Sequence, residues 1–254
     1  MLLTPIVCVA ILAREWRWTE LATLAAAFAA LAAKDPLVVL VRQRYIWKQQ
    51  HPETAAAAKW FAGWMVIFTL NGLVLLFTWP LREVIFMGVG VGVFSTIAIA
   101  INVKNRQRST FFQIVSAVAL TSSSLATSLS ATGDIAPWCW WLWLLMTMQA
   151  TAGILVVHAR LDARIASRGT VPAGEQFRRA AQVALGVLLC AAIVATILRR
   201  GWIALALLVA VVGYWRDLSR QRNTASLQIP LKTVGQRALA LSSLFAVLLI
   251  MGFW

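Results

Sequence analysis

Nine apolar stretches run along the chain, and short polar segments separate them. Most approach the roughly 20 residues that a helix needs to cross the hydrocarbon core of a bilayer, although the first and eighth are shorter. Lipid offers the backbone no hydrogen-bonding partner, so we expect these stretches to be helical. The predicted spans are residues 1–13, 18–41, 60–79, 84–103, 111–131, 135–157, 180–198, 202–215 and 238–254.

The basic residues between the stretches alternate in density. Eighteen of the 23 lysine and arginine residues lie in the even-numbered connections, and five lie in the odd-numbered ones. Connections rich in these residues stay in the cytoplasm. The pattern therefore predicts a cytoplasmic N-terminus and an external C-terminus.

The composition affects how the net positive charge is interpreted. The chain is 61% hydrophobic and 13% charged, whereas a soluble domain carries roughly a quarter of charged residues. The net charge of +14 follows from the topology signal and favours anionic headgroups at the cytoplasmic face. We therefore expect membrane lipids as partners and no nucleic acid. The fold class predicted is an all-α transmembrane bundle, with one domain over residues 1–254.

The polar triplet Lys34, Asp35 and Pro36 lies near the predicted cytoplasmic end of the second span. One interpretation is a continuous helix, in which these ionisable side chains face a cavity or a partner. The other is a helix break, with Asp35 as N-cap and Pro36 as the first residue of a cytoplasmic helix. The sequence alone leaves both open.

Other polar residues inside the spans suit a cavity or a surface. We expect Asn71 and Gln149 to line a cavity. His158 and Asp162 are four residues apart and would share a helix face, but two groups do not make a metal site. The sequence predicts no metal and no cofactor.

Small residues inside the spans are interpreted as packing elements. Gly88 and Gly92 lie within an apolar stretch and suit close helix packing. We expect Cys8, Cys139 and Cys190 to be small buried hydrophobic residues, because they have no motif spacing.

A weak repetition links two of the basic connections. A pair of valines precedes Arg160 and Asp162, and another pair precedes Arg216 and Asp217. The pattern fits either an internal duplication or the ordinary sequence of a basic loop after an apolar helix.

Four short segments resemble the YwiC-like family of bacterial membrane proteins. They are Met1-Leu2-Leu3-Thr4-Pro5, Lys34-Asp35-Pro36-Leu37, Val156-Val157-His158-Ala159-Arg160-Leu161 and Leu231-Lys232-Thr233-Val234-Gly235. Family members typically begin with an Arg-Glu-His-Gly segment that is absent here, so we expect the first helix to start late. The resemblance implies a multi-pass protein of the bacterial cytoplasmic (inner) membrane. It implies no activity, because none is established for the family.

The arrangement of nine helices is also similar to that of the UbiA prenyltransferases. Their Asp-rich motifs hold Mg²⁺ and a prenyl diphosphate. Laid on this sequence, the first motif keeps Asp35 but has Val38 and Arg42 where further acids belong, and the second keeps Asp162. Single carboxylates among cations hold Mg²⁺ poorly, so prenyl transfer is not expected.

The favoured function is therefore binding of an anionic lipid or isoprenoid phosphate at a cytoplasmic mouth. A divergent prenyltransferase-like enzyme and a small transporter are the alternatives. A UbiA-like bundle would bring the basic connections together, and arginine suits phosphate because its planar fork donates two hydrogen bonds at once. The candidate ligand-binding residues are Lys34, Asp35, Arg42, Arg44, Asn71, Gln149, His158, Arg160, Asp162 and Arg164.

The orientation can be tested by labelling single cysteines in a background without native cysteines. We expect cysteines at positions 106 and 220 to react with an impermeant reagent only after the membrane is disrupted, because the basic connections stay inside. A cysteine at position 134 should react in intact cells. Labelling of position 134 only after disruption would show that the orientation is the reverse of the predicted one.

Overall fold

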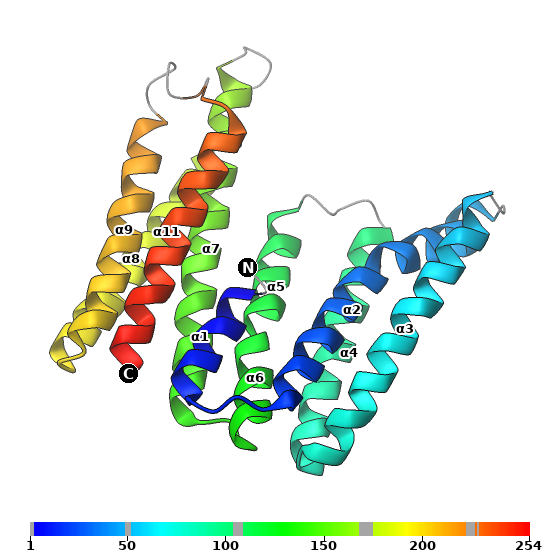
Figure 1. Cartoon of the computed structure of the whole chain (residues 1–254). Coiled ribbons are helices and arrows are strands. Elements are labelled where there is room, and N and C mark those ends of the chain that lie inside the picture. Colours follow the sequence, from blue (N-terminus) through cyan, green and yellow to red (C-terminus); the bar gives the residue numbers. More distant parts are fainter. Residues whose placement is uncertain (1–2, 49–51, 104–108, 168–174, 222–226, 228) are drawn as a thin grey trace. The chain divides into compact units, whose positions relative to one another are not determined.

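The computed structural model describes residues 3–48, 52–103, 109–167, 175–221, 227 and 229–254. Within this part the chain is helical and has no strand (Figure 1). The elements are α1 (Leu3–Ala13), α2 (Trp18–Arg42), the π-helical turn η1 (Gln43–Trp47), α3 (Glu53–Thr78), α4 (Leu81–Val103), α5 (Thr110–Thr121), α6 (Ser123–Thr132), α7 (Pro137–Ala166), α8 (Glu175–Ile197), α9 (Gly201–Arg220) and α11 (Leu231–Phe253).

Eight helical segments in the described part are long and apolar enough to cross a membrane. The predicted fifth span is one of them, although the helix is interrupted between α5 and α6. The first span is confirmed as an apolar helix, α1, but it has 11 residues and is shorter than a bilayer crossing. The all-helical, polytopic fold class is thus confirmed, and the protein is a multi-pass integral membrane protein.

Several helices extend beyond the predicted apolar spans into the basic segments. Helix α7 continues to Ala166 and α9 to Arg220, so the arginines after residue 157 and after residue 215 begin on helical turns rather than in loops. Helix α2 runs unbroken through Pro36 to Arg42. The helix break considered for Asp35 is therefore wrong, because the turns on both sides of Pro36 remain helical.

The chain divides into two compact units, which are described separately. The N-terminal unit is Val9–Trp140, and the C-terminal unit combines Leu3–Cys8 with Trp141–Trp254. The prediction that residues 1–254 form a single domain stays a prediction.

Small and hydroxylated residues join α2 to α6 in the N-terminal unit. The Thr19 hydroxyl donates to the Ser130 carbonyl at 2.7 Å, and Thr23 hydrogen-bonds the Ser130 hydroxyl. Beside them, Ala22 and Ala26 pack with Leu75 of α3. Small side chains let helix backbones approach closely in lipid, where the hydrophobic effect does not drive helices together.

A buried acid lies in the first turn of helix α2. Glu20 is 4% exposed, and its carboxylate accepts a hydrogen bond from the backbone N–H of Arg17 at 3.4 Å. An acid at this position satisfies an N–H that the first helical turn leaves without a partner. We therefore assign Glu20 a role in helix capping.

A polar contact of three helices lies inside the C-terminal unit. The Gln149 amide of α7 donates to the Tyr214 hydroxyl of α9 at 2.6 Å and to the Ser242 hydroxyl of α11 at 3.0 Å. Gly153, one turn after Gln149, makes room for the tyrosine: a Cβ there would lie 2.8 Å from the Tyr214 oxygen. Gln149 is thus occupied in helix packing.

Two of the packing predictions are wrong. Apart from the adjacent backbone of α4 itself, no heavy atom in the described residues lies within 4 Å of a Cβ built on Gly88 or Gly92, so these glycines do not form a close-packing pair here. Cys190 is exposed on α8, whereas Cys8 and Cys139 are buried as predicted. Both errors arise because an apolar span does not reveal which of its faces meets another helix.

The Gly153→Ala substitution tests the contact with Tyr214. The added methyl group would force the buried tyrosine to move, and overpacking of this kind costs about 1–3 kcal/mol. We expect a lower midpoint of thermal unfolding for the purified protein in detergent. Gly186→Ala is the matched control, because nothing lies within 4 Å of a Cβ at Gly186. Equal effects of the two substitutions would contradict the proposed contact.

Candidate functional site

Three arginines and one acid form a charged cluster in the C-terminal unit. Arg160 of α7 interacts electrostatically with Asp217 of α9, with Arg164 of its own helix and with Arg237 of α11. We call Arg160, Arg164, Arg237 and Asp217 the arginine cluster. Arg160 thus interacts with one carboxylate and two guanidinium groups, and these four residues together carry excess positive charge.

The burial of Arg160 makes this excess charge unusual. Its side chain is 6% exposed, whereas Arg164 and Asp217 are half-buried and Arg237 is exposed. A charge removed from water needs counter-charge and hydrogen bonds, and arginine is almost never fully buried otherwise. The cluster therefore combines a buried cation with further cations that face outward, an arrangement that suits an anion.

The helical extensions of α7 and α9 position this cluster. Arg160 and Arg164 are one turn apart on the last turns of α7, and Asp217 lies on the last turn of α9. The Gln221 amide donates to the Val156 carbonyl at 3.1 Å and joins the end of α9 to α7. The cluster is built on hydrogen-bonded helix ends rather than on loops.

His158 and Asp162 lie beside the cluster on α7. They interact electrostatically, as expected for residues four apart on one helix. The His158 ring also packs against Phe177 of α8, with ring centroids 5.3 Å apart. In the part of the chain that the structure describes, no group of three or more histidine, cysteine, aspartate or glutamate residues is placed to hold a metal ion.

The candidate residues of the N-terminal unit lie on α2, η1 and α3. Lys34 and Asp35 form an ion pair of 3.8 Å, and the Asp35 side chain is 86% exposed. Arg42 ends α2 half-buried, and Arg44 lies exposed on η1. Asn71 donates its amide to the Ile67 carbonyl of its own helix at 2.8 Å. Its hydrogen bond therefore serves α3 itself.

The ten candidate residues thus fall into two sets. Lys34, Asp35, Arg42, Arg44 and Asn71 belong to the N-terminal unit, and Gln149, His158, Arg160, Asp162 and Arg164 belong to the C-terminal unit. Within the second set, Arg160 and Arg164 come together in the cluster. The common cytoplasmic mouth predicted for both sets stays a prediction.

Sequence reasoning missed two members of the cluster, Arg237 and Asp217. Arg237 was counted as a topology signal, and it lies 77 residues after Arg160 in sequence. Asp217 had a signal, because the repeated pattern of valines, arginine and acid places it after the valines of α9 as Asp162 is placed after the valines of α7. Which residue it would contact depends on helix packing, which a local pattern does not encode.

Comparisons with known proteins bear on the family alone. The model of the YwiC-like protein family matches residues 1–129, which is half of the chain. No curated protein and no solved structure matches the chain, and the similarity to UbiA prenyltransferases stays a prediction. On the family match, this integral membrane protein belongs to the YwiC-like family.

Proposed function

We propose that the protein binds an anionic lipid or isoprenoid phosphate at the arginine cluster, at the predicted cytoplasmic face of a bacterial inner membrane. The observation that carries this proposal is the burial of Arg160 near two other arginines and the Asp217 carboxylate. A phosphate group would offset the net positive charge of these four residues. Its apolar chain would remain in the bilayer beside the helices.

The chemistry of the cluster favours phosphate over other anionic groups. A guanidinium group presents parallel N–H donors that match two phosphate oxygens, and charge-assisted bonds of this kind are roughly twice as strong as neutral ones. Burial strengthens the attraction, because the effective dielectric constant falls away from bulk water. Arg160 would therefore hold the phosphate from inside, and Arg164 and Arg237 would contact it from the rim.

The same cluster is poorly suited to the Mg²⁺ chemistry of prenyl transfer. Magnesium is bound through carboxylates and substrate phosphates, and the cluster sets one carboxylate, Asp217, against three arginines. A binding or assembly role is the better match for the cluster.

Substitution of the arginines by lysine separates phosphate binding from topology. Lysine keeps the positive charge but loses the planar fork, so Arg160→Lys with Arg164→Lys should reduce retention of a particular anionic lipid by about tenfold. The measurement is mass spectrometry of lipids that co-purify with the protein. Expression and cysteine-labelling pattern should stay normal, because topology requires only charge.

The matched control replaces Arg178 and Arg179 by lysine in the same unit. Arg179 forms an exposed ion pair with Glu175 at 2.6 Å and lies outside the cluster. These substitutions should leave the retained lipids unchanged. If the cluster variant keeps the same lipids in the same ratios as the parent, the arginines serve topology alone and the proposal fails.

Replacement of the acid gives a prediction of opposite sign. Asp217→Asn removes the carboxylate that interacts with Arg160 and leaves a similar volume. We expect retention of the anionic lipid to rise by a few fold, because a competing negative charge is lost. Loss of lipid with normal thermal stability would show that Asp217 positions Arg160 for binding, and would contradict simple charge competition.

A further inference from the structure

A cleft of about 420 Å³ lies between α2 and α3 in the N-terminal unit. It shares no lining residue with the arginine cluster. It is shallow and open to its surroundings, so it is a surface site rather than an enclosed cavity. Ala56 and Ala57 leave this space, because their small side chains do not reach across to α2. The lining residues are Asp35, Pro36, Val39, Glu53, Ala56, Ala57, Trp60 and Trp64.

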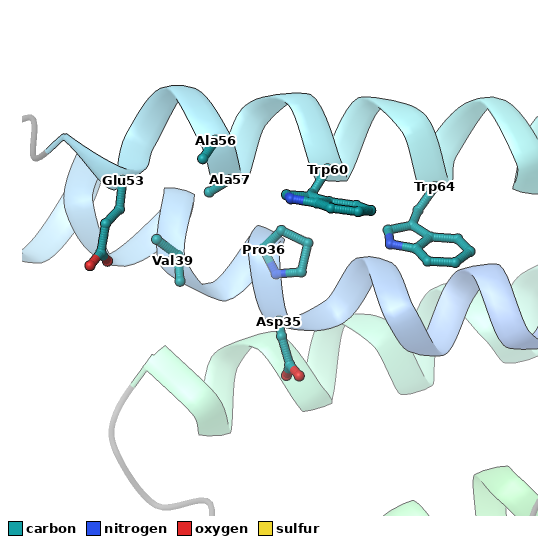
Figure 2. A pocket seen from close by; sticks show the side chains of 8 residues that line it. All are labelled: Asp35, Pro36, Val39, Glu53, Ala56, Ala57, Trp60 and Trp64. Carbon is teal, nitrogen blue, oxygen red and sulfur yellow. The ribbon is translucent and has the colours of Figure 1, made fainter.

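Two tryptophans form the aromatic wall of this cleft. Figure 2 shows Trp60 and Trp64 reaching from α3 toward α2, with the Trp60 ring over Pro36. Trp60 is 66% exposed, and the Trp64 ring packs edge-on against Phe28 with centroids 5.8 Å apart. An indole ring is the best aromatic partner for an ammonium group within about 6 Å of its face. The wall is therefore suited to a cation.

The charge of the lining points the same way. Basic residues outnumber acidic ones by 23 to 9 in the chain, yet both charged residues that line the cleft are acidic. The Asp35 carboxylate points away from α3 and pairs with Lys34 (Figure 2). Among the described residues Glu53 has no ion pair, so it is the lining carboxylate that would meet a cation.

The end of the cleft at Glu53 is held in place by a hydrogen bond. The hydroxyl of Thr54, the next residue, donates to the side-chain oxygen of Gln43 on η1. Gln43 is 4% exposed, so the bond joins the start of α3 to a buried group. The bond therefore joins the first turn of α3, on which Glu53 lies, to η1.

We propose that this cleft binds the ammonium headgroup of a zwitterionic membrane lipid. The lipid source is favoured because the cleft lies between two helices that are long and apolar enough to cross a membrane. Val66, Ile67 and Leu70 of α3 follow the tryptophans and are exposed, so they offer an apolar surface for acyl chains. The ammonium group would lie against Trp60 and near Glu53. This site and its ligand are independent of the arginine cluster.

The test compares two lipids bound to purified full-length protein. Nanodiscs would contain phosphatidylethanolamine and phosphatidylglycerol in equal amounts, and native mass spectrometry would give the ratio of the two on the released protein. Trp60→Leu should lower the bound ratio of phosphatidylethanolamine to phosphatidylglycerol by about tenfold, since the aromatic partner of the ammonium is lost. Glu53→Gln, which keeps the size of the side chain, should lower it by about threefold.

Trp18→Leu is the matched control, because Trp18 is also exposed, at 62%, but begins α2 and does not line the cleft. It should leave the ratio unchanged. The proposal is overturned if Trp60→Leu leaves the ratio unchanged or lowers both lipids equally, which would make Trp60 a general interfacial anchor. Displacement of the lipid by free ethanolamine without acyl chains would overturn the lipid assignment. Arginine-cluster variants that lose only an anionic lipid would separate the two sites.

Discussion

The hydrocarbon core of a membrane leaves a polar group no partner except the protein itself, and this constraint organises the molecule. It requires helices, and it also directs the hydroxyl groups within them. Thr121 donates to the Ala117 carbonyl at 2.8 Å, and Thr196 donates to the Ala192 carbonyl at 2.9 Å, each one turn back on its own helix. In α6, Thr127 donates to the Ser123 carbonyl in the same way, so this serine- and threonine-rich helix can be buried.

Hydrogen bonds between helices restrict how the helices can pack more than they add to stability. Such bonds in membrane proteins contribute about 0.6 kcal/mol each on average. The contacts of Thr19 with Ser130 and of Gln149 with Tyr214 are therefore too weak to hold either unit together alone. Their directions, however, allow few rotations of one helix against the next, and so they select one arrangement among many that pack apolar surface equally well.

Much of the fold follows from the hydrophobic pattern, because span length and helical structure both depend on local sequence. The limits of that pattern appear at particular residues. Pro36 is compatible with a helix start or a helix interior, and in the structure it lies inside α2. The exposure of Cys190 and the open surface at Gly88 depend on which helix lies opposite, and an apolar run carries no such information.

The candidate site was predictable in part for the same reason. Arg160 and Arg164 are one turn apart, so sequence spacing is enough to place them together. Arg237 joins them only because α11 packs along α9 in the folded unit. In the sequence, Glu53 and the tryptophans of the cleft have the pattern of an ordinary helix start at a membrane interface. Their role as a lining depends on the alanines beside them and on the packing of α2 against α3.

The exposed thiol of Cys190 makes helix α8 accessible to measurement without engineering. Cys8 and Cys139 are enclosed by neighbouring side chains, so a small apolar reagent dissolved in the bilayer reaches Cys190 first. A nitroxide attached there would sense the gradients of oxygen and water that run across a membrane. The native protein thus carries its own depth marker, from which the immersion of one helix follows directly.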